Sequence, residues 1–153
     1  MTSRSDRLAA AGITLPPVAA PIAAYVPSRR SGDLIWTSGQ LPLAGGQLVA
    51  TGKLGAAVTT EVGRAAARTA ALNAVAAVAD QAGGIDAILR VVRVVVYVAS
   101  TTDFIEQSQV ANGASELMTE IFGADSGAHV RSAVGVSVLP LDAPVEVELV
   151  VEV

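Results

Sequence analysis

The sequence predicts an α+β fold with the element order β-β-α-β-α-β-β, in which two long helices pack on one face of a mixed sheet. Three observations predict it. Residues 60–82 and 104–122 repeat apolar side chains at helical spacing. Residues 88–98 are almost continuously β-branched, as in a strand buried over most of its length. Residues 145–153 alternate apolar side chains with glutamates, which indicates a strand with one buried face.

Size and composition limit the classes of protein to which the chain can belong. It has 153 residues, of which 52% are hydrophobic, and this suits one domain with a packed core. The net charge is −4 and the arginines are scattered, so we expect no nucleic-acid partner. Cysteine is absent, which excludes thiolate chemistry and fits a cytoplasmic location. The longest uncharged helical stretch, residues 69–79, is about half of a bilayer span, so no membrane segment is expected.

The first half of the chain begins with an extension. Ser5 or Asp6 is expected to cap a short helix that ends at Gly12, and residues 15–24, rich in proline and alanine, are expected to be an extended connector. We therefore divide the chain into an extension, residues 1–20, and a domain, residues 21–153. Strands are expected at 25–29 and 33–38 around a turn at 30–33, followed by irregular chain, a turn at Gly45-Gly46 and an extended stretch at 48–51.

The second half contains the helices and the main strands. Thr59-Thr60-Glu61 should start the first long helix, which Gly83-Gly84 should end. A central strand at 88–98 is expected to precede a second helix, capped by Ser100 or Thr102 and ending before Gly123. Strands at 130–138 and 145–153 complete the sheet. Its face opposite the helices still carries valines and Trp36, which predicts that another subunit covers it.

Two segments resemble a known family. The run Arg131-Ser-Ala-Val-Gly-Val-Ser-Val-Leu-Pro140 is followed by Glu146, fifteen positions after the arginine. Trp36-Thr-Ser-Gly-Gln-Leu-Pro42 contains a Ser-Gly-Gln loop, and Tyr25 lies thirteen residues before Ser38. These motifs, with Asn112 in the second long helix, resemble the RidA/YjgF-like reactive imine deaminase family, which is also labelled endoribonuclease L-PSP. The resemblance covers residues 21–153.

The resemblance implies a chorismate mutase-like homotrimer with sites between its subunits. It implies hydrolysis of reactive 2-imino and 2-enamino acids of the 2-aminoacrylate type to 2-keto acids and ammonia, without metal or organic cofactor. The ligand would then be a small imine or keto acid that bears a carboxylate. The site residues that it implies are catalytic Arg131 and Glu146, and substrate-binding Tyr25, Ser38, Gly39 and Asn112.

The chemistry of these side chains supports the same roles. The planar fork of the Arg131 guanidinium matches a carboxylate, although an ion pair at the surface is the alternative. Glu146 could activate a water as a general base, but the alternation of the strand places Glu148 and Glu152 on the same face. Ser38 and Gly39 could offer a hydroxyl and a backbone N–H to the ligand, or simply form a turn at the end of a strand.

A simple hairpin of the last two strands would set Glu146 opposite Ser137, about six residues and ~20 Å from Arg131. Either the strands pair otherwise or a neighbouring subunit completes the site. Two departures leave an alternative function open, because Ala133 stands where deaminases carry cysteine and His129 replaces a proline-like position. That alternative is a non-catalytic trimeric module that binds small carboxylates or a protein partner. His129 itself is expected on a loop or at the rim of a site.

Overall fold

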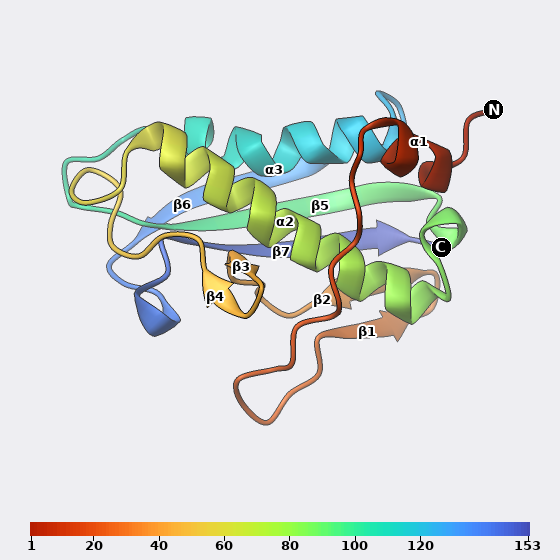
Figure 1. Cartoon of the computed structure of the whole chain (residues 1–153), viewed down its shortest axis with the longest axis horizontal. Helices are drawn as coiled ribbons and strands as arrows, with labels where there is room; N and C mark the ends of the chain where they lie inside the picture. The colour runs from red at the N-terminus through yellow and green to blue at the C-terminus, as the bar shows by residue number, and fades with distance from the viewer.

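The computed structural model describes all 153 residues, and a five-stranded sheet with two long helices on one face forms its centre (Figure 1). The strand order is β1-β2-β7-β5-β6, and every pairing is antiparallel except that of β5 with β6. The strands are β1 Ser28–Ser31, β2 Leu34–Thr37, β5 Arg90–Ala99, β6 Val130–Val136 and β7 Val145–Glu152. The predicted order of elements, the mixed sheet and the placement of the helices are confirmed.

The helices pack closely because small residues line their contact. Helix α2, Thr60–Ala82, is capped by the Thr59 side chain, ends at Gly83 with φ 83°, and buries a stripe composed mainly of alanines. Helix α3, Gln107–Phe122, crosses α2 on the same face of the sheet (Figure 1). At the crossing, Gly113 lies directly against the backbone carbonyl of Arg64. No helix in the chain is both long and apolar enough to cross a bilayer.

The close approach at Gly113 leads to a stability prediction. A Cβ at this position would overlap the Arg64 carbonyl oxygen, which is backbone and therefore cannot move alone. We expect Gly113→Ala to lower the free energy of unfolding by about 1–3 kcal/mol, the usual cost of overpacking, in urea titrations. Gly63→Ala is the matched control, since its Cβ would meet only the flexible end of the Leu54 side chain. Equal losses in both variants would contradict this explanation.

The second helix starts later than predicted. Ser100 and Thr102 do not cap it, because the chain there is tied down by backbone hydrogen bonds from Ser100 to Val136 and from Thr101 to Leu54. Residues 101–106 therefore form a loop, and α3 starts at Gln107 without a side-chain cap. The expected helical positions Phe104 and Ile105 lie in this loop.

The first hairpin is shifted along the chain. Tyr25 to Pro27 do not join the predicted strand at 25–29, whereas Arg30 and Ser31, expected in the turn, are in β1. The turn is reduced to Gly32-Asp33, and Gly32 has a left-handed φ of 61°. The turn at Gly45-Gly46 is confirmed, but it joins two short strands, β3 Leu43–Ala44 and β4 Gln47–Leu48, in place of the irregular chain and the stretch expected at 48–51.

The last two long strands do not form a hairpin. Strand β5 lies between β6 and β7 and pairs with both of them, so Glu146 lies opposite Tyr97 and not opposite Ser137. The simple hairpin behind the register estimate does not form, and of the two alternatives left open, the one in which the strands pair otherwise is confirmed. The chain between β6 and β7 includes the 3-10 turn η2, Pro140–Asp142, which leads the chain past the end of β5.

The N-terminal extension packs against the rest of the chain. Helix α1, Arg4–Ala10, is capped by Ser3 and not by Ser5 or Asp6 as expected, and Asp6 completes a capping box. Its Leu8 is buried in the main core, and Ser5 donates a hydrogen bond of 2.6 Å to Asp86, in the 3-10 turn η1, Ile85–Ala87. The connector then runs down across α2 to β1, without helix or strand (Figure 1).

Candidate active site

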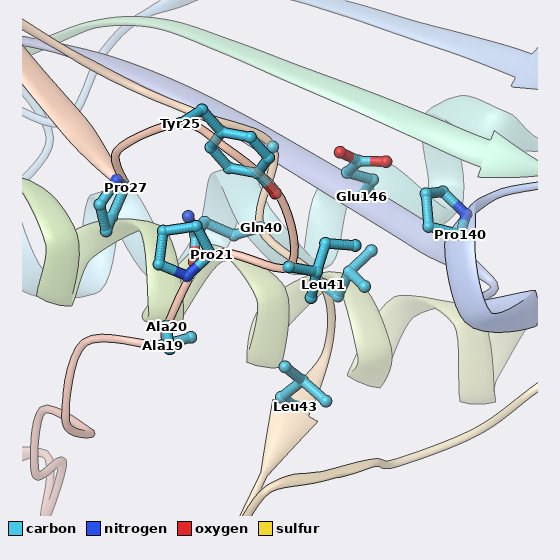
Figure 2. Close-up of a pocket in the computed structure, with 12 residues that line it drawn as sticks. Ala19, Ala20, Pro21, Tyr25, Pro27, Gln40, Leu41, Leu43, Pro140 and Glu146 are labelled. Carbon is cyan, nitrogen blue, oxygen red and sulfur yellow. The ribbon is translucent and has the colours of Figure 1, made fainter.

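Three of the predicted site residues line one cavity. Tyr25 stands on one side of it and Glu146 and Pro140 on the other, with Gln40 and Leu41 between them (Figure 2). Gly39 also lines the cavity. The cavity holds about 60 Å³, which is less than half of the ~150 Å³ of a cavity that takes up benzene. Most of its other lining residues are apolar: Ala19, Ala20, Pro21, Ile22, Pro27, Leu41 and Leu43. A small ligand in this cavity would meet an apolar wall and one carboxyl group.

Glu146 reaches the cavity because of the alternation of β7. Val145 and Val147 are fully buried beneath the helices, so the residue between them points to the other face of the sheet. Burial, and then the neighbouring Glu148 carboxylate, raises the pKa of Glu146 above its ordinary value. Its carboxyl group packs directly on Gly39, so that a Cβ at this position would displace it. Glu146 is therefore a carboxylate that holds a proton more readily than a solvated one.

The loop that carries Gly39 is fixed from two sides. Gln40 exchanges backbone hydrogen bonds of 2.8 and 2.9 Å with Val147 of β7. From α2, the Asn73 amide donates 3.0 Å hydrogen bonds to the carbonyls of Leu41 and Leu43. Asn73 is only 4% exposed, and none of the sequence motifs includes it. A single amide within a stripe of buried alanines was the signal that could have identified it, since a buried amide requires partners.

Ser38 and Gly39 differ in what they can offer a ligand. The Ser38 hydroxyl donates to the Val26 carbonyl at 2.5 Å, and its backbone N–H donates to Pro27 at 2.8 Å. Ser38 therefore holds the connector in place. The N–H of Gly39 makes no hydrogen bond within the chain and lies beside Glu146, so it remains available as a donor. Tyr25 is 45% exposed in irregular chain and can close over the cavity.

Arg131 lies on the helix-covered face, apart from this cavity. It pairs in register with the buried Val94, which places its side chain under α3. Its Nη1 donates to Asn112 Oδ1 at 2.8 Å and to Ser115 Oγ at 3.1 Å, and its Nη2 donates to the Ser108 carbonyl at 3.3 Å. None of these acceptors carries a charge. Arg131 takes part in no salt bridge within the chain, so its charge is available to an anion.

Ser115 and His129 form a further part of this arrangement that sequence reasoning missed. His129 Nε2 lies 2.9 Å from Ser115 Oγ, and His129 Nδ1 lies 2.6 Å from the Gly127 carbonyl oxygen. The predicted position of His129, on a loop before β6, is correct. Its connection to Arg131 through Ser115 could not be read from a sequence separation of 14 residues.

The predicted residues therefore form two half-sites in one chain. We call Tyr25, Gly39 and Glu146, with the supporting Ser38, the carboxyl half-site, and Arg131 with Asn112 the guanidinium half-site. Arg131 and Glu146 are two strands apart and point to opposite faces of the sheet. One small ligand cannot contact both side chains of the same chain.

Comparisons with known proteins identify a family model and solved structures that match almost the whole chain. A family model described as "YjgF/chorismate mutase-like, putative endoribonuclease" matches residues 5–153. Protein TCP17 of Trypanosoma cruzi is 48% identical over 143 residues, which cover 92% of this chain and 88% of that protein. A crystal structure of a "putative endoribonuclease" from Shewanella oneidensis is 37% identical, covers 99% of both chains and has a TM-score of 0.94. A protein of unknown function from Agrobacterium tumefaciens is 38% identical, with a TM-score of 0.88 and coverage of 99% and 92%.

Proposed function

This chain belongs to the YjgF/chorismate mutase-like family, and we propose that it hydrolyses reactive 2-imino and 2-enamino acids to 2-keto acids and ammonia at sites between the subunits of a homotrimer. One observation carries the proposal. A guanidinium without an anionic partner and a carboxyl group with a raised pKa lie on opposite faces of one sheet. The guanidinium half-site has no general base, and the carboxyl half-site has no cationic group to bind a carboxylate. A second copy of the chain can place one half-site beside the other.

The two half-sites suit the two ends of a 2-imino acid. The carboxylate of the ligand would accept hydrogen bonds from Arg131 of one subunit. The Glu146 carboxylate of the next subunit would take a proton from water as the water oxygen attacks the imine carbon, and would then pass that proton to the imine nitrogen. The resulting carbinolamine then breaks its C–N bond, and ammonia leaves as the hydroxyl loses its proton to form the keto group. Water is the only co-reactant, and no electrons are transferred.

Exposed apolar side chains support assembly. Trp36 and Val130 face away from the helices and are 48% and 66% exposed. Ile22 and Leu141, near the cavity, are also exposed. A sheet face and a cavity rim of this kind are typical of a surface covered in an oligomer. The cytoplasm, where such imines arise from amino-acid metabolism, is the location that we propose.

The proposal is tested by an imine-decay assay. The imine of alanine or leucine is generated by an L-amino-acid oxidase in the presence of semicarbazide, which traps imine that remains. We expect the purified chain to suppress semicarbazone formation and to increase the yield of 2-keto acid and ammonia. The suppression should reach a plateau as the enzyme concentration rises. A preparation that leaves semicarbazone formation unchanged, at enzyme concentrations where the trimer is present by light scattering, would overturn the deaminase proposal.

Ala133 favours a second candidate function. It lies two residues after Arg131 on the same strand face, where its methyl group packs partly against the core and offers no polar group to a substrate. We infer that the alternative is a trimeric module that binds small carboxylates without turnover. Calorimetry would select it if 2-ketobutyrate or benzoate binds while imine decay is unaffected. The net charge of −4 and the pairing of three arginines with glutamates argue against an endoribonuclease activity, because binding of phosphates requires free basic side chains.

A further inference from the structure

The hydrogen bonds around His129 have a fixed direction. The Gly127 carbonyl can only accept, so His129 Nδ1, 2.6 Å away, carries the proton. In the neutral imidazole Nε2 is then an acceptor, and the Ser115 hydroxyl, 2.9 Å away, donates to it. With its proton turned toward His129, Ser115 Oγ presents its lone pairs to Arg131 Nη1, 3.1 Å away. The chain of bonds runs from Arg131 through Ser115 and His129 to Gly127.

This series of hydrogen bonds determines which edge of the Arg131 guanidinium is free. Arginine has five N–H donors, and the two on Nη1 are directed at Asn112 and Ser115 while one on Nη2 is directed at Ser108. The Nε–H and the second Nη2 donor make no hydrogen bond within the chain. Nε and Nη2 together form the edge of the guanidinium to which a carboxylate can bind side-on. An Nη1 without its acceptors could rotate away and spoil that alignment.

We propose that His129 and Ser115 are positioning residues, which hold the Arg131 guanidinium with its Nε and Nη2 edge toward the ligand carboxylate. The inference rests on the proposed function in that it takes Arg131 as the group that receives the carboxylate. His129 acts only through Ser115, because its two ring nitrogens are both engaged within the chain. It does not exchange protons with the substrate.

His129→Met tests the proposal because methionine is of similar length and replaces the imidazole nitrogen by a thioether sulfur, which accepts hydrogen bonds only weakly. Without that acceptor, the Ser115 hydroxyl is free to turn its proton toward Arg131. We expect KM for the imine and the Kd of 2-ketobutyrate to rise about 5- to 10-fold, the size expected for one positioning hydrogen bond, with kcat within about 2-fold. His129→Gln should restore most of the affinity, since its amide oxygen can accept from Ser115 where Nε2 did.

Ser115→Ala provides a second variant with a smaller change in side-chain volume, and its Kd for 2-ketobutyrate should rise by a similar factor. The double variant His129→Met/Ser115→Ala should have the same Kd for 2-ketobutyrate as Ser115→Ala alone, because both changes interrupt the same series of hydrogen bonds. Thermal unfolding of each variant shows whether it is folded. Wild-type Kd in folded His129→Met, or no rescue by His129→Gln, would overturn this inference alone. A wild-type protein that neither binds 2-ketobutyrate nor hydrolyses imines would overturn the proposed function instead.

Discussion

Arg131→Ala is expected to lower kcat/KM for imine hydrolysis by about 10²- to 10³-fold, because truncating one partner of a desolvated charge pair costs about 2–5 kcal/mol. Asn112, Ser115 and Ser108, which now accept hydrogen bonds from Arg131, carry no charge, so the variant leaves no buried ion without a partner. The fold should therefore survive the change. Kinetics of imine decay and circular dichroism check the two parts of this expectation.

Two further arginine variants make this prediction specific. Arg131→Lys keeps the charge and loses the planar fork, so we expect an activity between that of wild type and that of Arg131→Ala. Arg68→Ala removes an arginine on α2 whose guanidinium is paired with Glu120 at 2.7 Å, and its activity should match that of wild type. If Arg131→Ala retains wild-type kcat/KM, Arg131 is not the carboxylate-binding group.

Glu146→Gln is expected to lower kcat by about 10²- to 10⁴-fold, the usual contribution of a general base. It keeps the size of the side chain and its packing on Gly39, but the amide accepts no proton from water. In the wild type, activity should fall as the pH drops through the pKa of Glu146, which burial and Glu148 raise above its ordinary value. A pH profile of kcat without this acid limb would argue against Glu146 as the base.

The same variant should make the ligand-free fold more stable at neutral pH. A carboxyl group whose pKa is higher in the folded chain than in the unfolded chain binds a proton more tightly when folded. Its ionisation therefore costs stability as the pH rises through the unfolded and then the folded pKa. Glutamine has no such cost, so urea unfolding at pH 7 should show a higher free energy of unfolding for Glu146→Gln, and the difference should vanish below the unfolded pKa of about 4.3.

Mixing the two inactive variants tests whether the site is shared. If each site takes Arg131 from one subunit and Glu146 from the next, a mixed trimer of Arg131→Ala and Glu146→Gln chains contains some intact sites. Co-expression at equal amounts should restore about one quarter of the wild-type activity, because each of the two neighbours is the suitable variant with a probability of about one half. Mixtures that stay inactive, although mixed trimers are detected by mass spectrometry, would place the site within one chain.

The sequence predicted the fold well because its strongest patterns are those of the core. The valines and leucines that alternate along β7, and the alanines that repeat along α2, face the same core and leave little choice of register. Errors occurred where hydrogen bonds from distant chain decide the local structure. The start of α3 at Gln107 depends on bonds of the preceding loop to Leu54 and Val136, which no local propensity reveals.

The candidate site was predicted less completely than the fold. Its principal residues came from motif spacing, and the structure brings Arg131 next to Asn112 and Glu146 next to Gly39. Their supports were missed, because Asn73, Ser115 and His129 act across separations that only the tertiary structure closes. The central position of β5 was predicted, but its neighbours β6 and β7 were not, since a parallel neighbour cannot be inferred from two consecutive strands.

The placement of Arg131 and Glu146 on opposite faces of the sheet has a consequence for regulation by concentration. A folded single chain would carry every functional side chain and still have no complete site. Specific activity should then drop on dilution below the dissociation constant of the assembly, while circular dichroism stays native. In a cell that makes little of this protein, the activity would therefore fall by a larger factor than the protein concentration.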